Sequence, residues 1–169
     1  MNSNPILIER ILNAPVEKVW KAITDKDKMT NQIYQCLWFN GQAKEAAEFY
    51  CSVFKNSKIT TDTPMVVIFE LNGKKFMGLN GGPQFKFTEA VSFVVDCETQ
   101  EEIDYYWNNL IADGGMESQC GWLKDKFGLS WQIIPTVIGK LMSDKEKGPR
   151  VMQAIMQMKK IDIEKLINA

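Results

Sequence analysis

The sequence contains no histidine, and this absence excludes several kinds of catalytic site. The Ser-His-Asp and Cys-His arrangements both depend on an imidazole that takes the proton of the nucleophile. The H-E-x-x-H zinc motif also needs two histidines. Because histidine is the side chain whose ordinary pKa lies nearest to neutral pH, the chain also lacks the usual general base.

An excess of positive charge is missing as well. The 20 Lys and Arg residues are balanced by 21 Asp and Glu residues, so the net charge is −1. Proteins that bind nucleic acid carry a concentrated basic surface. Here the two short basic clusters, Lys21–Lys28 and Lys159–Lys160, have the pattern of solvated helix faces. We therefore expect no nucleic-acid partner.

Long apolar runs are also absent. No stretch of roughly 18 consecutive apolar residues occurs, and a membrane-spanning helix requires such a stretch. The first residues, Met1 to Asn4, do not begin a basic region followed by an apolar one, so no signal peptide is predicted. These two absences predict a cytoplasmic protein with no membrane partner.

Cysteine is present, but not in closely spaced pairs. None of the four residues Cys36, Cys51, Cys97 and Cys120 belongs to a C-x-x-C motif, and each lies in apolar or aromatic surroundings. Zinc and redox motifs use closely spaced pairs. We therefore predict buried free thiols in a reducing cytosol rather than disulfides or metal ligands.

The length of 169 residues and the apolar content of 45% suit one globular domain with room for an appendage. Near the N-terminus the pattern predicts a strand at 5–12 and a helix that begins near Pro15, since proline is favoured in a first turn. An apolar stripe at helical spacing follows, made of Val16, Val19, Trp20 and Ile23. Residues 25–31 are polar, as in a linker.

The central part of the chain contains an internal repeat of the order β-α-β-β-β. The first copy is predicted at 33–39, 43–54, 58–62, 65–71 and 75–80, and the second at 90–96, 99–112, 116–119, 121–125 and 129–134. Glu48-Phe49-Tyr50 matches Asp104-Tyr105-Tyr106 at an offset of 56 residues. Because one copy alone would expose a sheet face, we predict that the two copies pair into one domain.

After Pro135 the chain is predicted to be helical to its end. A methionine-rich apolar stripe lies there, made of Val151, Met152, Ile155, Met156 and Met158, with Ile161, Ile163, Leu166 and Ile167 beyond it. Exposed apolar patches of this size are rare on monomers, and the edge strands of an open sheet also need cover. We therefore predict a homodimer in which this stripe and the strand Ile6–Leu12 pack onto the partner.

Several segments of the repeat are similar to a known family. They are Cys36-Leu37-Trp38-Phe39-Asn40-Gly41-Gln42-Ala43, Glu45-Ala46-Ala47-Glu48-Phe49-Tyr50, Val53-Phe54, Phe76–Asn80 with Gly81-Gly82, and Asp125-Lys126-Phe127-Gly128-Leu129-Ser130-Trp131-Gln132. Through them the chain resembles the PhnB-like branch of the vicinal-oxygen-chelate superfamily, which includes glyoxalase I, bleomycin-resistance proteins and extradiol dioxygenases. The resemblance implies an α+β fold in which two paired βαβββ modules form a cupped mixed sheet. It also implies dimers whose sites lie near the subunit contact.

This resemblance divides the chain into parts. A strand-helix appendage at 1–30 precedes a vicinal-oxygen-chelate domain at 31–160, and residues 161–169 form a C-terminal helical end. Within the domain, the first module covers 31–82, the second covers 88–134 and a helical tail covers 135–160.

The appendage carries a second resemblance. Ile8-Glu9-Arg10 and Asn13-Ala14-Pro15-Val16-Glu17-Lys18-Val19-Trp20 are similar to the opening strand and helix of the activator-of-Hsp90-ATPase, START-like family. The match is confined to residues 6–30, far short of a domain of that class, so it implies no function.

Members of the PhnB-like branch often carry the label 3-demethylubiquinone-9 3-methyltransferase. The sequence shows no glycine-rich strand-to-helix loop of the kind that holds a nucleotide-type cofactor. A vicinal-oxygen-chelate fold is also not a methyltransferase fold. We therefore expect neither methyl transfer nor a cofactor.

Metal-dependent members of the superfamily hold a divalent ion with ligands on the first, fourth, fifth and eighth strands, typically His, Glu, His and Glu. The resemblance places these positions at Tyr34, at Met77 or Gly78, at Ala90 and at Gln132. A Gln is too weak a ligand to hold a divalent ion alone. No metal site is therefore predicted.

The same correspondence places Tyr34 inside the cup of the implied fold. Since alternate strand residues point to opposite faces, Cys36 and Trp38 join it, while Leu37 and Phe39 pack under a helix. By the same rule the second module contributes Ser92 and Val94, together with Ser130, Gln132 and Ile134. The candidate ligand-binding residues are Tyr34, Cys36, Trp38, Ser92 and Gln132. Such a cup suits a neutral, partly aromatic ligand, and the alternative is that these side chains simply close it.

No catalytic residue is predicted. Glu101 and Glu102 lie at a helix start beside Thr99, where the helix dipole favours acidic residues. Cys36 and Cys120 have no histidine to activate them as nucleophiles.

Together these observations favour a metal-independent small-molecule-binding protein. One alternative is an enzyme of the same fold that works without a metal. Another is an inactive structural or fusion remnant, which the truncated N-terminal segment favours. The short stretch Ile59–Met65 also favours it, because relatives carry a longer loop there that borders the pocket.

Overall fold

The computed structural model describes residues 32–169, and Tyr34–Ala169 form one compact unit. The N-terminal strand and helix, the START-like segment and the basic cluster Lys21–Lys28 all lie outside the described residues. They therefore stay predictions.

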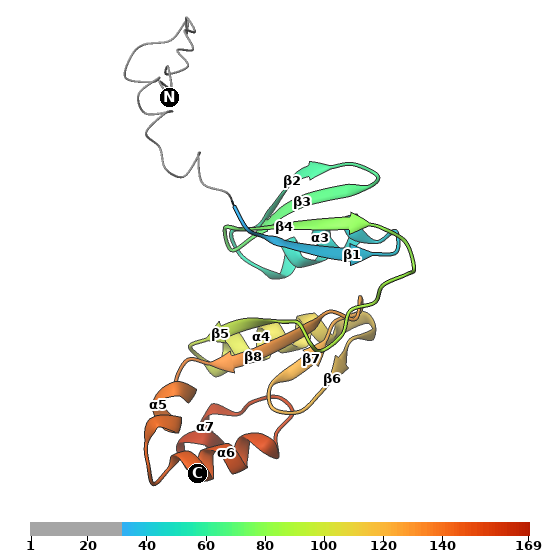
Figure 1. Cartoon of the computed structure of the whole chain (residues 1–169). Coiled ribbons are helices and arrows are strands. Elements are labelled where there is room, and N and C mark those ends of the chain that lie inside the picture. The colour runs from blue at the N-terminus through green and yellow to red at the C-terminus, as the bar shows by residue number, and fades with distance from the viewer. Residues whose placement is uncertain (1–31) are drawn as a thin grey trace, which may run out of the picture. The chain divides into compact units, whose positions relative to one another are not determined.

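The first module is a four-stranded sheet with one helix packed on it (Figure 1). Its elements are β1 (Gln35–Phe39), α3 (Ala43–Val53), β2 (Lys58–Asp62), β3 (Val66–Leu71) and β4 (Lys74–Asn80). The strand order is β1-β4-β3-β2. β1 pairs with β4 in parallel and the other pairs are antiparallel, so the sheet is mixed.

The second module repeats this arrangement, with short strands at β6 and β7. Its elements are β5 (Ser92–Cys97), α4 (Gln100–Ile111), a 3-10 turn at Ala112–Gly114, β6 (Met116–Glu117), β7 (Trp122–Lys124) and β8 (Ser130–Pro135). The strand order is β5-β8-β7-β6, again with one parallel pair, β5 with β8. The α+β class and the paired βαβββ modules predicted from the sequence are thereby confirmed.

Local signals in the sequence set several element boundaries. Asn72 and Gly73 both have positive φ, 49° and 75°, as a type I′ turn between β3 and β4 requires. The Thr99 side chain accepts a hydrogen bond from the backbone N–H of Glu102 at 3.3 Å and caps α4. Pro149 lies in the first turn of α6 (Gly148–Met156), a position that proline favours.

Small residues let α3 approach its sheet closely. Its buried face consists of Ala43, Ala46, Ala47, Tyr50 and Val53. A Cβ placed on Gly78 of β4 would lie 3.0 Å from the Ala43 Cβ, so this contact has no room for another methyl group. Leu37 and Phe39 of β1 are buried beneath the helix, as predicted.

The two modules share one hydrophobic core. Buried residues of α3 and its sheet belong to the same cluster as Ile103 and Trp107 of α4 and Trp131 and Ile133 of β8. Phe54 stacks on both Tyr106 and Trp131, with ring centroids 5.3 and 5.2 Å apart. The modules are therefore held together through their helix-covered faces.

A buried carboxylate, Asp125, reinforces that junction. The side chain is 3% exposed and accepts four hydrogen bonds. Its Oδ2 accepts from the Tyr50 hydroxyl and the Trp131 indole N–H, both at 2.8 Å, and its Oδ1 accepts from the N–H groups of Phe127 and Leu129 at 2.9 and 3.1 Å. Burial raises the pKa of Asp125, and these donors oppose the rise. Tyr50 belongs to the first module and the other partners to the second, so the carboxylate joins the two.

The C-terminal helices form a small cluster of their own. α5 (Ile138–Ser143), α6 and α7 (Ile163–Ile167) bury Val151, Ile155, Ile161 and Leu166 among themselves. Much of the stripe that we expected to pack onto a partner is thus covered within the chain. Met152, Met156 and Ile167 stay exposed. Within residues 32–169, no helix has the length and apolar character needed to cross a membrane.

Candidate functional site

The face of the first sheet that α3 does not cover carries three of the five candidate residues. Cys36 and Trp38 alternate with the buried Leu37 and Phe39, so they lie on the opposite face, which we name the first outer face. Met77 and Leu79 of β4 pair with Cys36 and Trp38 in register and share this face. The facing predicted for β1 is confirmed.

Trp38 is held rigidly at one end of the first outer face. Its indole N–H donates to the Gly82 carbonyl at 2.8 Å, and the Phe85 ring packs edge-on at 5.0 Å. A Cβ on Gly81 would lie 2.2 Å from the indole ring, so only glycine fits there. The Gly81-Gly82 pair in the sequence therefore serves to seat this tryptophan.

Tyr34 lies at the other end of the face. The Lys75 ammonium sits over its ring, 4.1 Å from the centroid. Cys36, between Tyr34 and Trp38, is exposed, and its thiol donates only to the Met77 sulfur at 3.7 Å. All four cysteines are free, as predicted, but only Cys97 is buried. Cys51 and Cys120 are half-buried, and Cys36 is exposed because no layer covers its side of β1.

The second sheet has an equivalent surface, which we name the second outer face. Ser92, Val94 and Gln132 lie on it, and the Gln132 amide donates to the Ser92 hydroxyl at 2.9 Å. Val94 is 56% exposed. Ser130 pairs with Ser92 in register, and its buried hydroxyl has no hydrogen-bond partner among the described residues.

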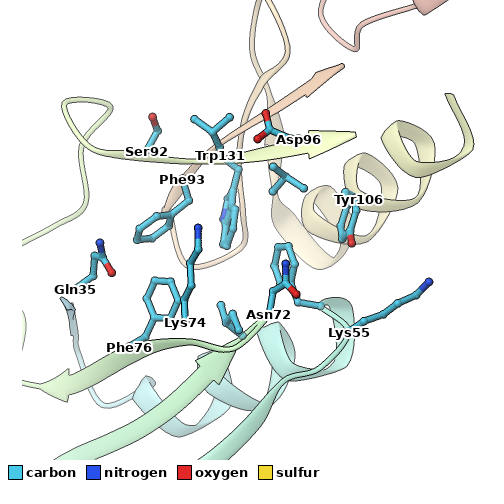
Figure 2. Close-up of a pocket in the computed structure, with 14 residues that line it drawn as sticks. Gln35, Lys55, Asn72, Lys74, Phe76, Ser92, Phe93, Asp96, Tyr106 and Trp131 are labelled. Carbon is cyan, nitrogen blue, oxygen red and sulfur yellow. The ribbon is translucent and has the colours of Figure 1, made fainter. Parts of the chain in front are cut away.

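The five candidate residues do not converge within one chain. Phe76 and Phe93, on the helix-covered faces of the two sheets, meet with ring centroids 5.4 Å apart. Figure 2 shows Phe93 pointing toward Phe76 and Ser92 pointing to the other side of β5. The two outer faces therefore turn away from the shared core and from each other. Tyr34, Cys36 and Trp38 form one group, and Ser92 and Gln132 form another.

The positions that hold a metal ion in metal-dependent relatives do not suit one here. Tyr34, Ala90 and Gln132 offer a phenol, a methyl group and a carboxamide, and the fourth-strand position offers the thioether of Met77 or, at Gly78, no side chain. Divalent ions in proteins are held chiefly by carboxylates, imidazoles and thiolates. In the described part of the chain, no three His, Cys, Asp or Glu residues come close enough to bind a metal.

A pocket of about 500 Å³ lies between the modules on the opposite, helix-covered side (Figure 2). We name it the inter-module pocket. It is lined by Gln35, Phe54, Lys55, Leu71, Asn72, Lys74, Phe76, Ser92, Phe93, Val94, Val95, Asp96, Tyr106 and Trp131. Patterns along the sequence do not reveal it, because its walls come from both modules and alternation assigns its aromatic residues to the core. The aromatic residues of the two repeat copies are the sequence feature that could have indicated this pocket.

Comparisons with known proteins identify relatives of this chain. The family model described as 3-demethylubiquinone-9 3-methyltransferase matches residues 31–134. A solved structure described as a 3-demethylubiquinone-9 3-methyltransferase, PhnB protein, from Bacillus cereus shares 35% identity, with a TM-score of 0.57. That match covers 63% of this chain and 100% of the other.

A second solved structure is similar in fold alone. Protein PA1353 from Pseudomonas aeruginosa is 19% identical, with a TM-score of 0.51, over 63% of this chain and 98% of that one. No curated protein matches the chain.

Proposed function

From the premise that the chain belongs to the 3-demethylubiquinone-9 3-methyltransferase family, the PhnB-like branch of the vicinal-oxygen-chelate superfamily, we propose that it binds a small molecule without a metal ion. The ligand is neutral and partly aromatic, and the protein works in the cytoplasm as a homodimer. The binding cup forms between the first outer face of one copy and the second outer face of the other.

The observation that carries this proposal is the division of the candidate residues between two outward-turned faces. Tyr34, Cys36 and Trp38 supply aromatic and apolar surface, and Ser92 with Gln132 supplies hydrogen-bonding groups. Ligand sites commonly combine apolar walls with a few polar groups that orient the ligand. One copy leaves each half open, whereas a second copy encloses both.

Exposed apolar side chains on the second face support the same pairing. Val94 and Met116 are 56% and 61% exposed, and they lie on the side of the sheet away from α4. The repeated module order gives the chain two similar halves, so a two-fold axis between copies would create two equivalent cups. Such an interface has to bury about 800 Å² on each partner to be stable.

Mixed dimers test the proposal. Met77→Arg damages the first outer face, and Gln132→Arg damages the second. In either homodimer both cups contain one damaged face, so binding of the neutral probe N-phenylnaphthylamine should be lost. A dimer of one Met77→Arg copy and one Gln132→Arg copy contains one cup with no substitution, so it should bind one probe per dimer.

Two results would overturn the proposal. One is a monomer in sedimentation at micromolar concentration. The other is a mixed dimer that binds no more probe than its parents do. A thermal-shift series with divalent ions tests the metal-free part, because stabilisation that a chelator removes would show that part to be wrong.

A further inference from the structure

We propose that the inter-module pocket is a second ligand site, which takes a compact aromatic acid: a planar ring system that carries a carboxylate or sulfonate. It opens on the helix-covered side of the chain and extends to the edge of β5, where Ser92 and Val94 also line it. Its volume of about 500 Å³ falls within the range of small-molecule sites, which is roughly 300 to 1,000 Å³.

The aromatic part of the ligand is recognised by rings from both modules. Phe76 meets Phe93 edge-to-face at 5.4 Å, and Phe93 lies against Trp131 at the same centroid distance. On the other side Phe54 stacks on Tyr106 at 5.3 Å. Phe54, Phe93 and Tyr106 are only partly buried, so they present ring surface to the pocket. A planar ligand can extend this network of aromatic contacts.

The acid group is recognised by Lys74. This residue begins β4, and alternation puts it on the same face as Phe76. Figure 2 shows its side chain directed into the pocket, whereas Lys55 extends outward. Lys74 takes part in none of the ion pairs formed by residues 32–169.

No acidic side chain opposes Lys74. Asp96 borders the pocket, but Figure 2 shows its carboxylate on the far side of β5, together with Ser92. The neutral amides of Gln35 and Asn72 complete the polar rim. The charge available to a ligand is therefore positive, which favours an anion.

The edge of the second sheet adds donors to the site. β5 pairs only with β8, so within the described chain its other edge has no strand partner. Val94, Val95 and Asp96 on this strand line the pocket. Unpaired backbone N–H groups on an edge strand are available to an acid group in the same way as to another strand.

Anilinonaphthalene sulfonate is a suitable probe, because it joins an aromatic system to one sulfonate and fluoresces in apolar surroundings. We expect the wild-type chain to bind it in the pocket, and we expect Lys74→Glu to weaken binding at least tenfold, which corresponds to about 1.4 kcal/mol. Lys145→Glu makes the same charge change at an exposed position between α5 and α6, and it should leave binding unchanged.

A second comparison separates this site from the proposed cup. N-phenylnaphthylamine lacks the sulfonate, so Lys74→Glu should not affect its binding, while Gln132→Arg should remove it. Conversely, Met77→Arg, on the first outer face and outside the pocket lining, should leave the binding of anilinonaphthalene sulfonate unchanged. Equal weakening of the sulfonate probe by Lys74→Glu and Lys145→Glu, or no weakening by either, would overturn the proposal. Lys74 is exposed, so the variant is expected to fold, and its melting temperature checks this.

Discussion

At the scale of single residues, the buried Asp125 carboxylate joins the two modules. It sits in the segment Asp125–Gln132, which the sequence singled out through a family resemblance alone. The structure supplies the physical reason: two backbone and two side-chain donors surround the carboxylate. Removing one member of a buried charged network leaves the others without partners, and this is costly.

Asp125→Asn should therefore lower the free energy of unfolding by about 3 kcal/mol, because an amide offers a weaker acceptor and turns its own N–H groups toward other donors. Tyr50→Phe removes one donor of the four and should cost about 1 to 2 kcal/mol. Urea denaturation measures both. Ser52→Ala is a control, since its hydroxyl is exposed and contacts only the Phe49 carbonyl. A loss of less than about 0.5 kcal/mol in Asp125→Asn would contradict the role of the network.

The buried phenol of Tyr50 and the buried thiol of Cys97 make the stability of the fold depend on alkaline pH. Burial and the neighbouring Asp125 raise the pKa of Tyr50 well above its ordinary value. Burial, together with Glu102 and Asp96, raises the pKa of Cys97 from 9.0 to about 12. Between its ordinary and its raised pKa, each group keeps its proton in the folded state and loses it in the unfolded state. Stability should therefore be complete below pH 9.0 and fall as the pH rises toward about 12.

Chemical denaturation at a series of pH values between about 8 and about 11 measures this dependence. The ordinary pKa values of 9.0 for the Cys97 thiol and 10.0 for the Tyr50 phenol lie inside this interval. Cys97→Ala and Tyr50→Phe each remove one titrating group. Both variants are expected to lose stability at neutral pH, but their stability should depend less steeply on alkaline pH than that of the wild type. Equal slopes in all three proteins would contradict the assignment.

At the scale of elements, turn and cap residues fix where individual strands and helices begin and end. The β3–β4 hairpin turns on Asn72-Gly73, and α4 begins at its Thr99 cap, close to the predicted positions. These signals are local, because they depend on the backbone conformation of two to four neighbouring residues.

The hairpin allows conformational strain to be measured by itself. A Cβ on Gly73 would meet nothing closer than the Asn56 amide nitrogen at 3.6 Å, so Gly73→Ala creates no clash. The φ of 75° still disfavours an L-residue, and we expect a loss of about 1 kcal/mol.

Gly139→Ala is the matched control for that substitution. Gly139 lies in α5 with nothing within 4 Å of a new Cβ and without a positive φ. Alanine is favoured over glycine in helices, so this variant should gain up to about 1 kcal/mol. Thermal unfolding should therefore shift in opposite directions for the two variants, and a shift in the same direction would contradict the argument.

At the scale of the whole molecule, the C-terminal helices are attached to the second module by backbone and side-chain bonds. The N–H groups of Cys120 and Gly121 donate to the carbonyls of Met158 and Lys159, both at 2.7 Å. The Gln100 amide accepts from the Ile163 N–H at 2.9 Å and donates to the Ile161 carbonyl at 3.2 Å. One side chain on α4 thus binds two points of the tail.

Gln100→Ala should therefore loosen the tail without unfolding the modules. We expect faster hydrogen exchange in α7 and a loss of about 1 to 2 kcal/mol in stability, because two partly buried backbone groups lose their partner. Gln153→Ala is the control, since Gln153 is exposed on α6. Unchanged exchange in α7 would show that apolar packing alone holds the tail.

The sequence by itself determined the repeat, the strand and helix positions, the facing of β1 and β5, and the family. All of these follow from short-range periodicity, with a period of two in strands and 3.6 in helices, or from contiguous motifs. For this reason the sequence alone indicates that Leu37 and Cys36 point to opposite faces of β1. It also indicates that Tyr50 and Tyr106 occupy equivalent positions in the two modules.

Only the tertiary structure decided which way the faces turn. Periodicity says that Tyr34 and Cys36 share a face, but not whether that face meets Ser92 and Gln132. The answer depends on contacts between distant residues, such as the Tyr50–Asp125 hydrogen bond across 75 positions, and on whether the helices pack between the sheets or outside them. The inter-module pocket and the burial of much of the C-terminal stripe within the chain follow from the same long-range packing, which alternation along one strand does not encode.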